Sequence, residues 1–111
     1  MENIVFKVVS EFSRTPSARI AKEGKHPGEE LRNMITPKIR LALNNNVKFI
    51  IDLDEVAGYG TSFLEEVFGG LIREEKFSLI QLQQVLEIKS DEEPELIDEI
   101  WQDIKDANDD L

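Results

Sequence analysis

The sequence contains no cysteine, a single histidine and no long apolar run, and each absence removes a class of function. Without cysteine the chain can form no disulfide, no thiolate metal site and no cysteine nucleophile. With His26 as the only histidine, a multi-histidine metal site is also excluded. No apolar stretch approaches the roughly 20 residues of a membrane span, and the first residues lack the pattern of a signal peptide. We expect a cytoplasmic protein that has no cofactor and no membrane partner.

The net charge of −10 is unevenly distributed along the 111 residues. Residues 1–45 hold eight Lys or Arg against five Asp or Glu, whereas residues 46–111 hold five against eighteen. A protein that binds nucleic acid needs a basic stripe for phosphate contacts, so we expect no nucleic-acid partner. The acidic half steers a charged protein partner, or it is a solvated face without a function.

Apolar runs alternate with amphipathic stretches, which predicts the α/β class. The expected sheet has about four strands, mixed or mostly parallel and covered by helices. A single domain over residues 1–111, with its core at about 4–105, accommodates all of them. The expected strands are 4–9, 18–21, 47–53 and 85–88; the expected helices are 29–44, the stretch after residue 60, and an acidic C-terminal helix at about 92–107.

Local signals refine this outline. Residues 47–53 form the most apolar strand, which suits a central position covered on both faces. Pro37 kinks the first long helix, or the helix restarts there with Thr36 as its cap. Gly69 and Gly70 lie inside a helix, where glycine costs about 1 kcal/mol relative to alanine, so we expect another element to approach closely. Residues 78–84 add a helical turn.

The loop after the central strand is the expected working surface, because ligands and partners of such sheets bind beyond the carboxyl ends of strands. Gly58 and Gly60 are expected to supply positive φ angles for a tight turn. Tyr59 lies between them as a partner contact or as a half-buried lid on the core. Ser62 and Glu65 have the spacing of a capping box, and Thr61 is the alternative cap. The hydroxyl that does not cap lies beside unpaired amides, where a phosphate is favoured.

Several segments resemble known families. An apolar strand that ends in Asp-Leu, followed by a short loop and by Thr61 and Ser62 opening an amphipathic helix, resembles the STAS domain of anti-sigma-factor antagonists. A bacterial STAS-like family of unknown function is more similar. Its resemblance to this chain lies in Thr15, Pro16 and Arg19, in residues 28–32, and above all in residues 62–71. The resemblance covers roughly residues 4–105 and implies a STAS-like fold.

The antagonist resemblance implies a non-catalytic regulatory protein that switches partners with an ATP-binding, kinase-like protein. It aligns Thr61 with the serine that the kinase phosphorylates, and Ser62 with the serine after it. Two positions depart from the antagonist pattern: Gly60 replaces an aspartate, and Phe63 replaces a glycine. Nearby acidic side chains oppose an added phosphate, which carries a charge of about −1.5 to −2.

Two hypotheses follow. The first is a protein-interaction module, not an enzyme, whose partner-binding or regulatory residues are Gly58, Tyr59, Gly60, Thr61, Ser62 and Glu65. The alternative is a domain that senses a small ligand, such as a nucleotide or another phosphate. Arg19 and Arg32 are the candidate contacts to a phosphate or an acidic partner, since arginine binds such groups with two hydrogen bonds. They are equally able to neutralise the chain's own acidic half, and Arg32 to pair with a neighbouring glutamate.

Overall fold

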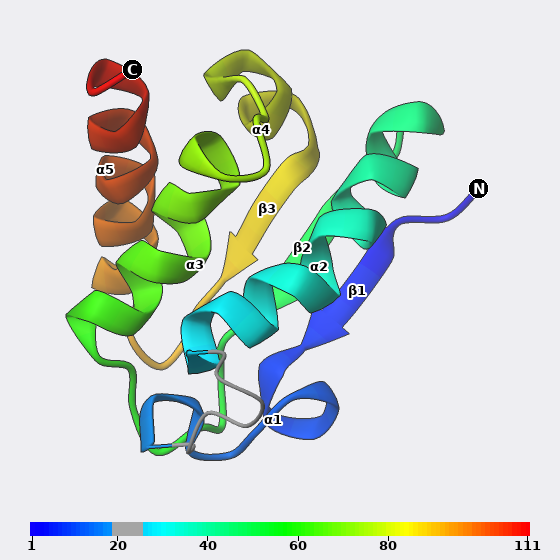
Figure 1. Ribbon diagram of the computed structural model, residues 1–111. Helices are drawn as coiled ribbons and strands as arrows, with labels where there is room; N and C mark the ends of the chain where they lie inside the picture. The colour runs from blue at the N-terminus through cyan, green and yellow to red at the C-terminus, as the bar shows by residue number, and fades with distance from the viewer. Residues whose placement is uncertain (19–25) are drawn as a thin grey trace.

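Three short parallel strands form the sheet in a computed structural model that describes residues 1–18 and 26–111. The strands are β1 (Ile4–Lys7), β2 (Phe49–Asp52) and β3 (Leu86–Lys89), and β2 lies between the other two. Ile4 is in register with Phe49, and Phe49 with Leu86. The α/β class and the inner position of the most apolar strand are confirmed, with three strands in the described residues instead of about four (Figure 1).

Helices make up most of the rest. They are α1 (Val8–Glu11), the 3-10 turn η1 (Pro16–Ala18), α2 (Pro27–Asn44), α3 (Thr61–Arg73), α4 (Leu79–Val85) and α5 (Glu95–Asp109). α3 packs against α2 on one side and against α5 on the other, so that α5 and β1 lie at opposite ends of the molecule (Figure 1). None of the helices in the described part of the chain is both long and apolar enough to cross a membrane.

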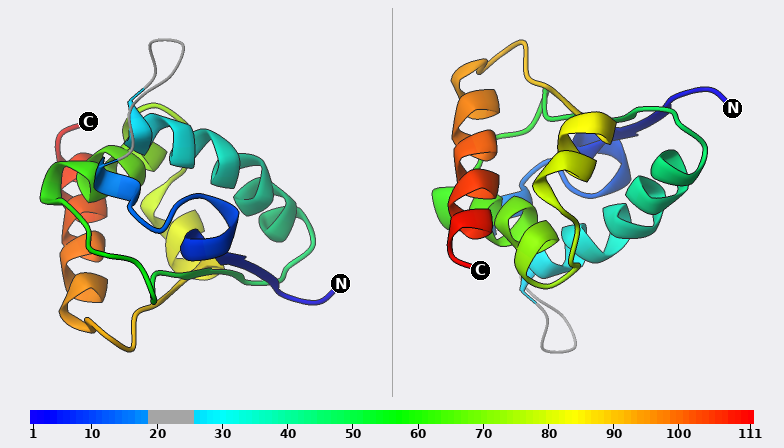
Figure 2. Two further views of the ribbon diagram at one scale, coloured as in Figure 1. Left: turned by 90° about the horizontal axis from the view of Figure 1, so that it is seen from below. Right: turned by 90° about the horizontal axis from the view of Figure 1, so that it is seen from above.

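The sheet is covered on one face only. Strand side chains that point toward the helices are buried, and they are Phe6, Phe49, Ile51, Leu86 and Ile88. On the opposite face Val5, Glu87 and Lys89 are exposed, and Ile50 is only half-buried. α2 and α3 lie on the same side of the strands (Figure 2). The expectation that β2 is covered on both faces is therefore wrong. Three consecutive apolar residues, Phe49 to Ile51, gave no sequence sign that buried and half-buried positions alternate along β2. Ile50 is half-buried because its neighbours on the uncovered face are Val5 and Glu87.

Element boundaries differ from the sequence expectation at several places. Val8 and Val9 leave the strand and form the short helix α1. α2 begins at Pro27 and runs without interruption through Pro37, so of the two alternatives the restart at Thr36 is wrong. Of the fourth expected strand, Ala18 ends the turn η1, and residues 19–21 lie outside the described part of the chain.

Candidate functional site

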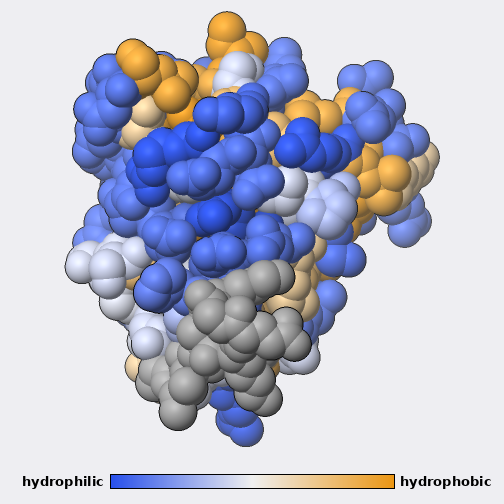
Figure 3. All heavy atoms as spheres, in the orientation of Figure 1, coloured by the Kyte–Doolittle hydropathy of each residue, from blue (hydrophilic) through white to orange (hydrophobic). Residues whose placement is uncertain are grey.

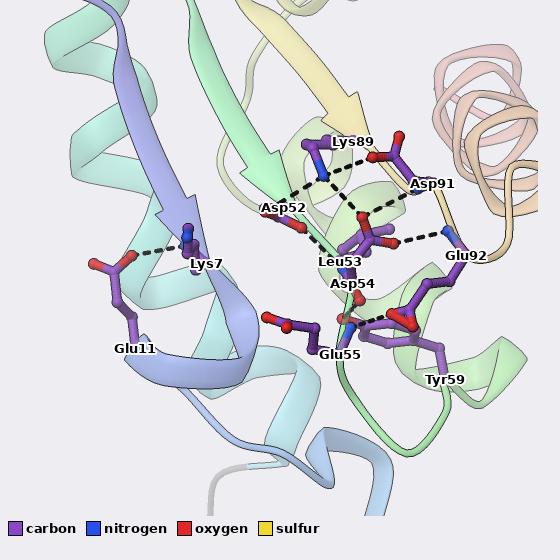
Figure 4. Close-up of polar contacts among 10 residues, drawn as sticks. All are labelled: Lys7, Glu11, Asp52, Leu53, Asp54, Glu55, Tyr59, Lys89, Asp91 and Glu92. Atoms are coloured by element: carbon purple, nitrogen blue, oxygen red, sulfur yellow. Dashed lines mark hydrogen bonds and ion pairs between the residues drawn. The ribbon is translucent and has the colours of Figure 1, made fainter.

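The carboxyl ends of β2 and β3 carry a compact group of charges. The Lys89 ammonium lies 2.9 Å from carboxylate oxygens of both Asp54 and Asp91, and 3.8 Å from Asp52 (Figure 4). These ion pairs and the surrounding negative charge raise the pKa of Lys89, which therefore stays protonated. Lys89 neutralises part of the acidic edge and ties the two strand ends together.

Asp54 joins the two loops at this edge. Its carboxylate accepts hydrogen bonds from the amides of Asp91 at 3.1 Å and Glu92 at 3.0 Å, in addition to the Lys89 ammonium. Burial acts to raise the pKa of Asp54, but these donors outweigh it, so the pKa is lowered. The carboxylate is used inside the chain, where it fixes the loop after β2 to the loop after β3.

Tyr59 fastens the tip of the β2–α3 loop to the core. Its hydroxyl donates to the Leu53 carbonyl at 2.8 Å, and its ring stacks on Phe63 with centroids 6.2 Å apart. Burial and then the negative charges of Asp52 and Asp54 raise the pKa of Tyr59, so the phenol keeps its proton. Of the two alternatives, these contacts support the lid on the core.

The same loop is also held by the segment that precedes α2. The Gly60 amide donates to Ser17 Oγ at 2.7 Å, and the Ala57 amide donates to the Arg14 carbonyl at 2.9 Å. Sequence reasoning missed these roles of Arg14 and Ser17, since each lies 43 residues before the group that it binds and no local pattern links them. Together with Tyr59 they give the loop a fixed conformation.

α3 begins without a side-chain cap. Gly60 occupies the cap position, and Thr61 and Ser62 are the first two residues of the helix, both exposed. The predicted capping by Ser62 or Thr61 is therefore wrong, because the helix starts directly after a residue that has no side chain. Gly60 takes a φ of −74°, so of the two glycines only Gly58, at 158°, has the expected positive φ.

Glu65 has a different partner from the one predicted. Its carboxylate accepts two hydrogen bonds from the Arg73 guanidinium, at 2.6 and 2.8 Å, two helical turns farther along α3. Gly69 lies between them, and a methyl group there would come within 2.2 Å of the Glu65 carboxylate. The sequence contains a working capping box elsewhere, at the start of α4, where Ser78 and Gln81 bond reciprocally.

The two exposed hydroxyls face different surroundings. Thr61 lines a hollow of about 210 Å³ between α3 and α5, together with Leu64, Glu99, Gln102 and Asp103. Burial and the neighbouring carboxylates of Glu65, Asp106 and Glu99 raise the pKa of Asp103 to about 6. Ser62 lines a second hollow, of about 280 Å³, where the starts of α2 and α3 meet; its other lining residues are Ser17, His26, Pro27, Gly28, Phe63 and Glu66.

Arg32 joins α2 to α3. Its side chain is buried, and it donates to the Glu66 carbonyl at 2.7 Å and to the Glu75 carboxylate at 3.1 Å. The predicted close approach to the glycine pair is confirmed at Gly70, where a methyl group would lie 2.4 Å from the Arg32 guanidinium. These contacts support the internal pairing of Arg32 over a contact to phosphate. Arg19, the other candidate, lies outside the described residues.

Comparison with known proteins identifies the family. A family model described as a STAS-like domain of unknown function (DUF4325) matches residues 27–96, from the start of α2 to the first turn of α5. The match covers more than half of the chain and includes the β2–α3 loop with both hydroxyls. No curated protein and no solved structure matches the sequence. The chain belongs to the family of STAS-like domains of unknown function (DUF4325).

Proposed function

We propose that this chain is a non-catalytic regulatory module that binds a protein partner through the α3-start surface, which consists of residues 58–62 and Glu65. The observation that carries the proposal is the exposure of Thr61 and Ser62 at the uncapped start of α3. The first amides of a helix have no partner within it, so this end carries a partial positive charge and offers donors. Hydroxyls and amides are thus presented together to a second protein.

The rigidity of the loop supports this role. The loop is held from within by Tyr59, and from the segment that precedes α2 by Arg14 and Ser17. A surface that already has its bound shape loses less conformational entropy on association, and more of the contact energy then appears as affinity. The internal use of Asp54 and Lys89 serves the same end, because it fixes the loop at its base.

Phosphorylation of Thr61 by a kinase-like ATPase is the finer form of the proposal. A phosphate on Thr61 would lie beside the hollow that contains Glu99 and Asp103. Like-charge repulsion there would weaken the packing of the α3 start on α5 and would change the charge that a partner meets. A phosphate that disturbs the unmodified conformation of the α3-start surface is suited to releasing a partner that binds this conformation.

The geometry around the histidine supports a non-catalytic role. His26 and Ser62 line the same hollow, yet within residues 1–18 and 26–111 no hydrogen bond joins them. A nucleophilic serine is activated by a base in hydrogen-bond contact. The carboxylate that lines this hollow, Glu66, forms an ion pair with Arg32 at 3.3 Å.

Site-specific crosslinking in cells tests the proposal. A photoreactive residue at position 62 should give a discrete crosslinked protein, and one at Gln83, which is exposed on α4 away from the loop, should not. Thr61→Glu should reduce the yield at position 62 by about tenfold, an effect of about 1.4 kcal/mol. Gln83→Glu, which adds the same charge elsewhere, should leave the yield unchanged. Equal crosslinking from positions 62 and 83 would refute the assigned surface.

A parallel experiment tests the alternative function, the sensing of a small ligand. Thermal unfolding of the purified chain is followed with ATP, GTP or inorganic phosphate at millimolar concentration. A ligand that binds the folded state stabilises it in proportion to the logarithm of its concentration over Kd. The interaction proposal expects no shift, since Glu66 adds negative charge to the hollow beside Ser62. A saturable rise in melting temperature would favour sensing instead.

A further inference from the structure

β1 has a free edge. It pairs with β2 on one side, and within the described residues no strand lies on its other side. The Ile4 amide donates toward β2, to the Lys48 carbonyl at 2.9 Å. Peptide groups alternate in direction along a strand, so Val5 and Lys7 direct their amides and carbonyls outward. The Lys7 amide donates to the Glu11 carboxylate at 2.7 Å (Figure 4). Val5 is therefore left at the centre of the exposed edge.

Apolar side chains flank this edge on both sides. Val5, on the uncovered face of the sheet, is 52% exposed. On the helical side Met34 is 39% and Leu41 is 45% exposed. At 100° per residue both lie about half a turn around α2 from Arg32, which contacts α3. They therefore lie on the side of α2 away from α3, which is the side of β1 (Figure 1). Hydrophobic side chains are visible on this flank beside β1 (Figure 3). We call Val5, Met34, Leu41 and the outer edge of β1 the β1 flank.

The charge distribution indicates what covers the β1 flank. Residues 91–110 hold ten Asp or Glu against one Lys, and most of them belong to α5, at the far end of the molecule from β1 (Figure 1). Residues 1–11, which include β1, hold only one Lys and two Glu. Two copies of a chain of charge −10 repel each other least when their α5 helices are farthest apart. Contact through the β1 flank has that arrangement.

We propose that two copies of this chain associate through the β1 flank, with their β1 strands antiparallel about a two-fold axis at Val5. The two Val5 residues then exchange amide and carbonyl hydrogen bonds, and the two sheets become one sheet of six strands. Such an interface is self-complementary, because the same patch supplies both sides. Met34 and Leu41 of the two copies cover the joined strands on the helical side. Thr61 and Ser62 stay exposed, so the inference does not depend on the proposed function.

Sedimentation velocity over a range of concentrations tests the association. The wild type should form a dimer that strengthens with added salt, since salt screens the repulsion between acidic chains. Val5→Lys and Leu41→Lys should each weaken it by at least about tenfold, because a lysine on an edge strand or its flank opposes pairing. Ile80→Lys is the matched control: Ile80 is 66% exposed on α4, away from the flank, and the substitution adds the same charge.

Glu11 provides a test in the opposite direction. Pairing beyond Val5 requires the Lys7 amide, which Glu11 occupies. Glu11→Ala should therefore tighten the dimer, and amide hydrogen exchange of residues 3–7 should slow as the concentration rises. A wild type that stays monomeric at millimolar concentration overturns the proposal. So does a dimer that Ile80→Lys weakens as much as Val5→Lys, or one that forms without protection of residues 3–7.

Discussion

Asp103 is the residue at which proton binding and folding are most clearly coupled. Burial and the carboxylates of Glu65, Asp106 and Glu99 raise its pKa to about 6, while Arg73 partly offsets them. An aspartate in the unfolded chain has a pKa of about 3.9. Between these two values Asp103 binds more protons in the folded chain than in the unfolded chain, so its contribution to the stability falls as the pH rises through this window and is constant above it.

Replacement of Asp103 by asparagine should remove this loss. At neutral pH we expect Asp103→Asn to raise the free energy of unfolding by about 1 kcal/mol, less than full linkage would give because water screens a half-exposed group. Urea unfolding at pH 5 and pH 7.5 should differ less in the variant than in the wild type. Asp98→Asn removes the same charge from an exposed position on α5 and should keep the wild-type pH dependence. An identical response of both variants would argue against the assigned cause.

Tyr59 tests whether the loop is held by its hydroxyl. Tyr59→Phe keeps the ring on Phe63 but removes the bond to the Leu53 carbonyl. We expect a loss of about 1 kcal/mol in stability, the usual net value of one hydrogen bond, and faster amide exchange in residues 54–60. Crosslinking from position 62 should fall as well, since the proposed surface depends on a fixed loop. Unchanged exchange would show that Ser17 and Arg14 hold the loop without the tyrosine.

At the scale of elements, the two adjacent glycines of α3 make a matched pair. A methyl group at Gly70 meets the buried Arg32 guanidinium, which is bound to Glu66 and Glu75 and cannot move aside. A methyl group at Gly69 meets only the ends of Glu65 and Arg73, which are flexible and partly exposed. The first contact joins two helices, whereas the second lies on one.

Gly70→Ala and Gly69→Ala should therefore have different effects. Alanine is favoured over glycine by about 1 kcal/mol within a helix. At Gly70 the clash should exceed that gain and give a net loss of about 1–2 kcal/mol. At Gly69 the gain should roughly cancel the loss of a surface ion pair, which is worth about 0–1 kcal/mol. Urea unfolding measures both, and an equal loss at the two positions would contradict the account of the α2–α3 contact.

The same elements show how far the sequence could predict the fold. Helical periodicity identified α2, α3 and α5, and the apolar run at residues 47–53 identified the inner strand. Boundaries were less accurate. Val8 and Val9 favour a strand by type, yet the chain turns there into α1, and neither residue has β2 as a neighbour. Periodicity gave no sign of the open face of the sheet, because it depends on which strand lies beside Ile50.

The candidate site was predictable in position and less so in detail. The carboxyl end of the inner strand located the loop and both hydroxyls. Local spacing suggested that Ser62 and Glu65 cap the helix, but the helix begins directly after Gly60, and Glu65 binds Arg73 instead. The roles of Ser17 and Asp54 depend on segments that meet only in the folded chain. Pairwise sequence spacing carries no information about such contacts.

For the molecule as a whole, the net charge of −10 destabilises the folded state, because like charges repel each other more strongly in the compact chain than in the unfolded chain. Salt screens this repulsion. Added sodium chloride should raise the urea midpoint, since screening of the net repulsion outweighs the weakening of a few surface ion pairs. Urea is the suitable denaturant, because guanidinium chloride is itself a salt. A midpoint that falls with salt would mean that pairs such as those of Lys89 contribute more than the repulsion costs.

Substitutions at the two ends of α5 distinguish the effect of net charge from the effect of the helix dipole. The C-terminal turn holds Asp106 and Asp109 and no basic residue, although a helix C-terminus favours cations. Changing Asp109 and Asp110 to lysine should raise the free energy of unfolding by about 0.5–1 kcal/mol for each, and should reduce the response to salt. Changing Glu95 and Asp98 to lysine alters the net charge by the same amount, but it places cations at the helix N-terminus, so we expect a loss of stability. If both double variants gained equally in urea unfolding, net repulsion alone would govern the stability and the helix dipole would contribute nothing measurable.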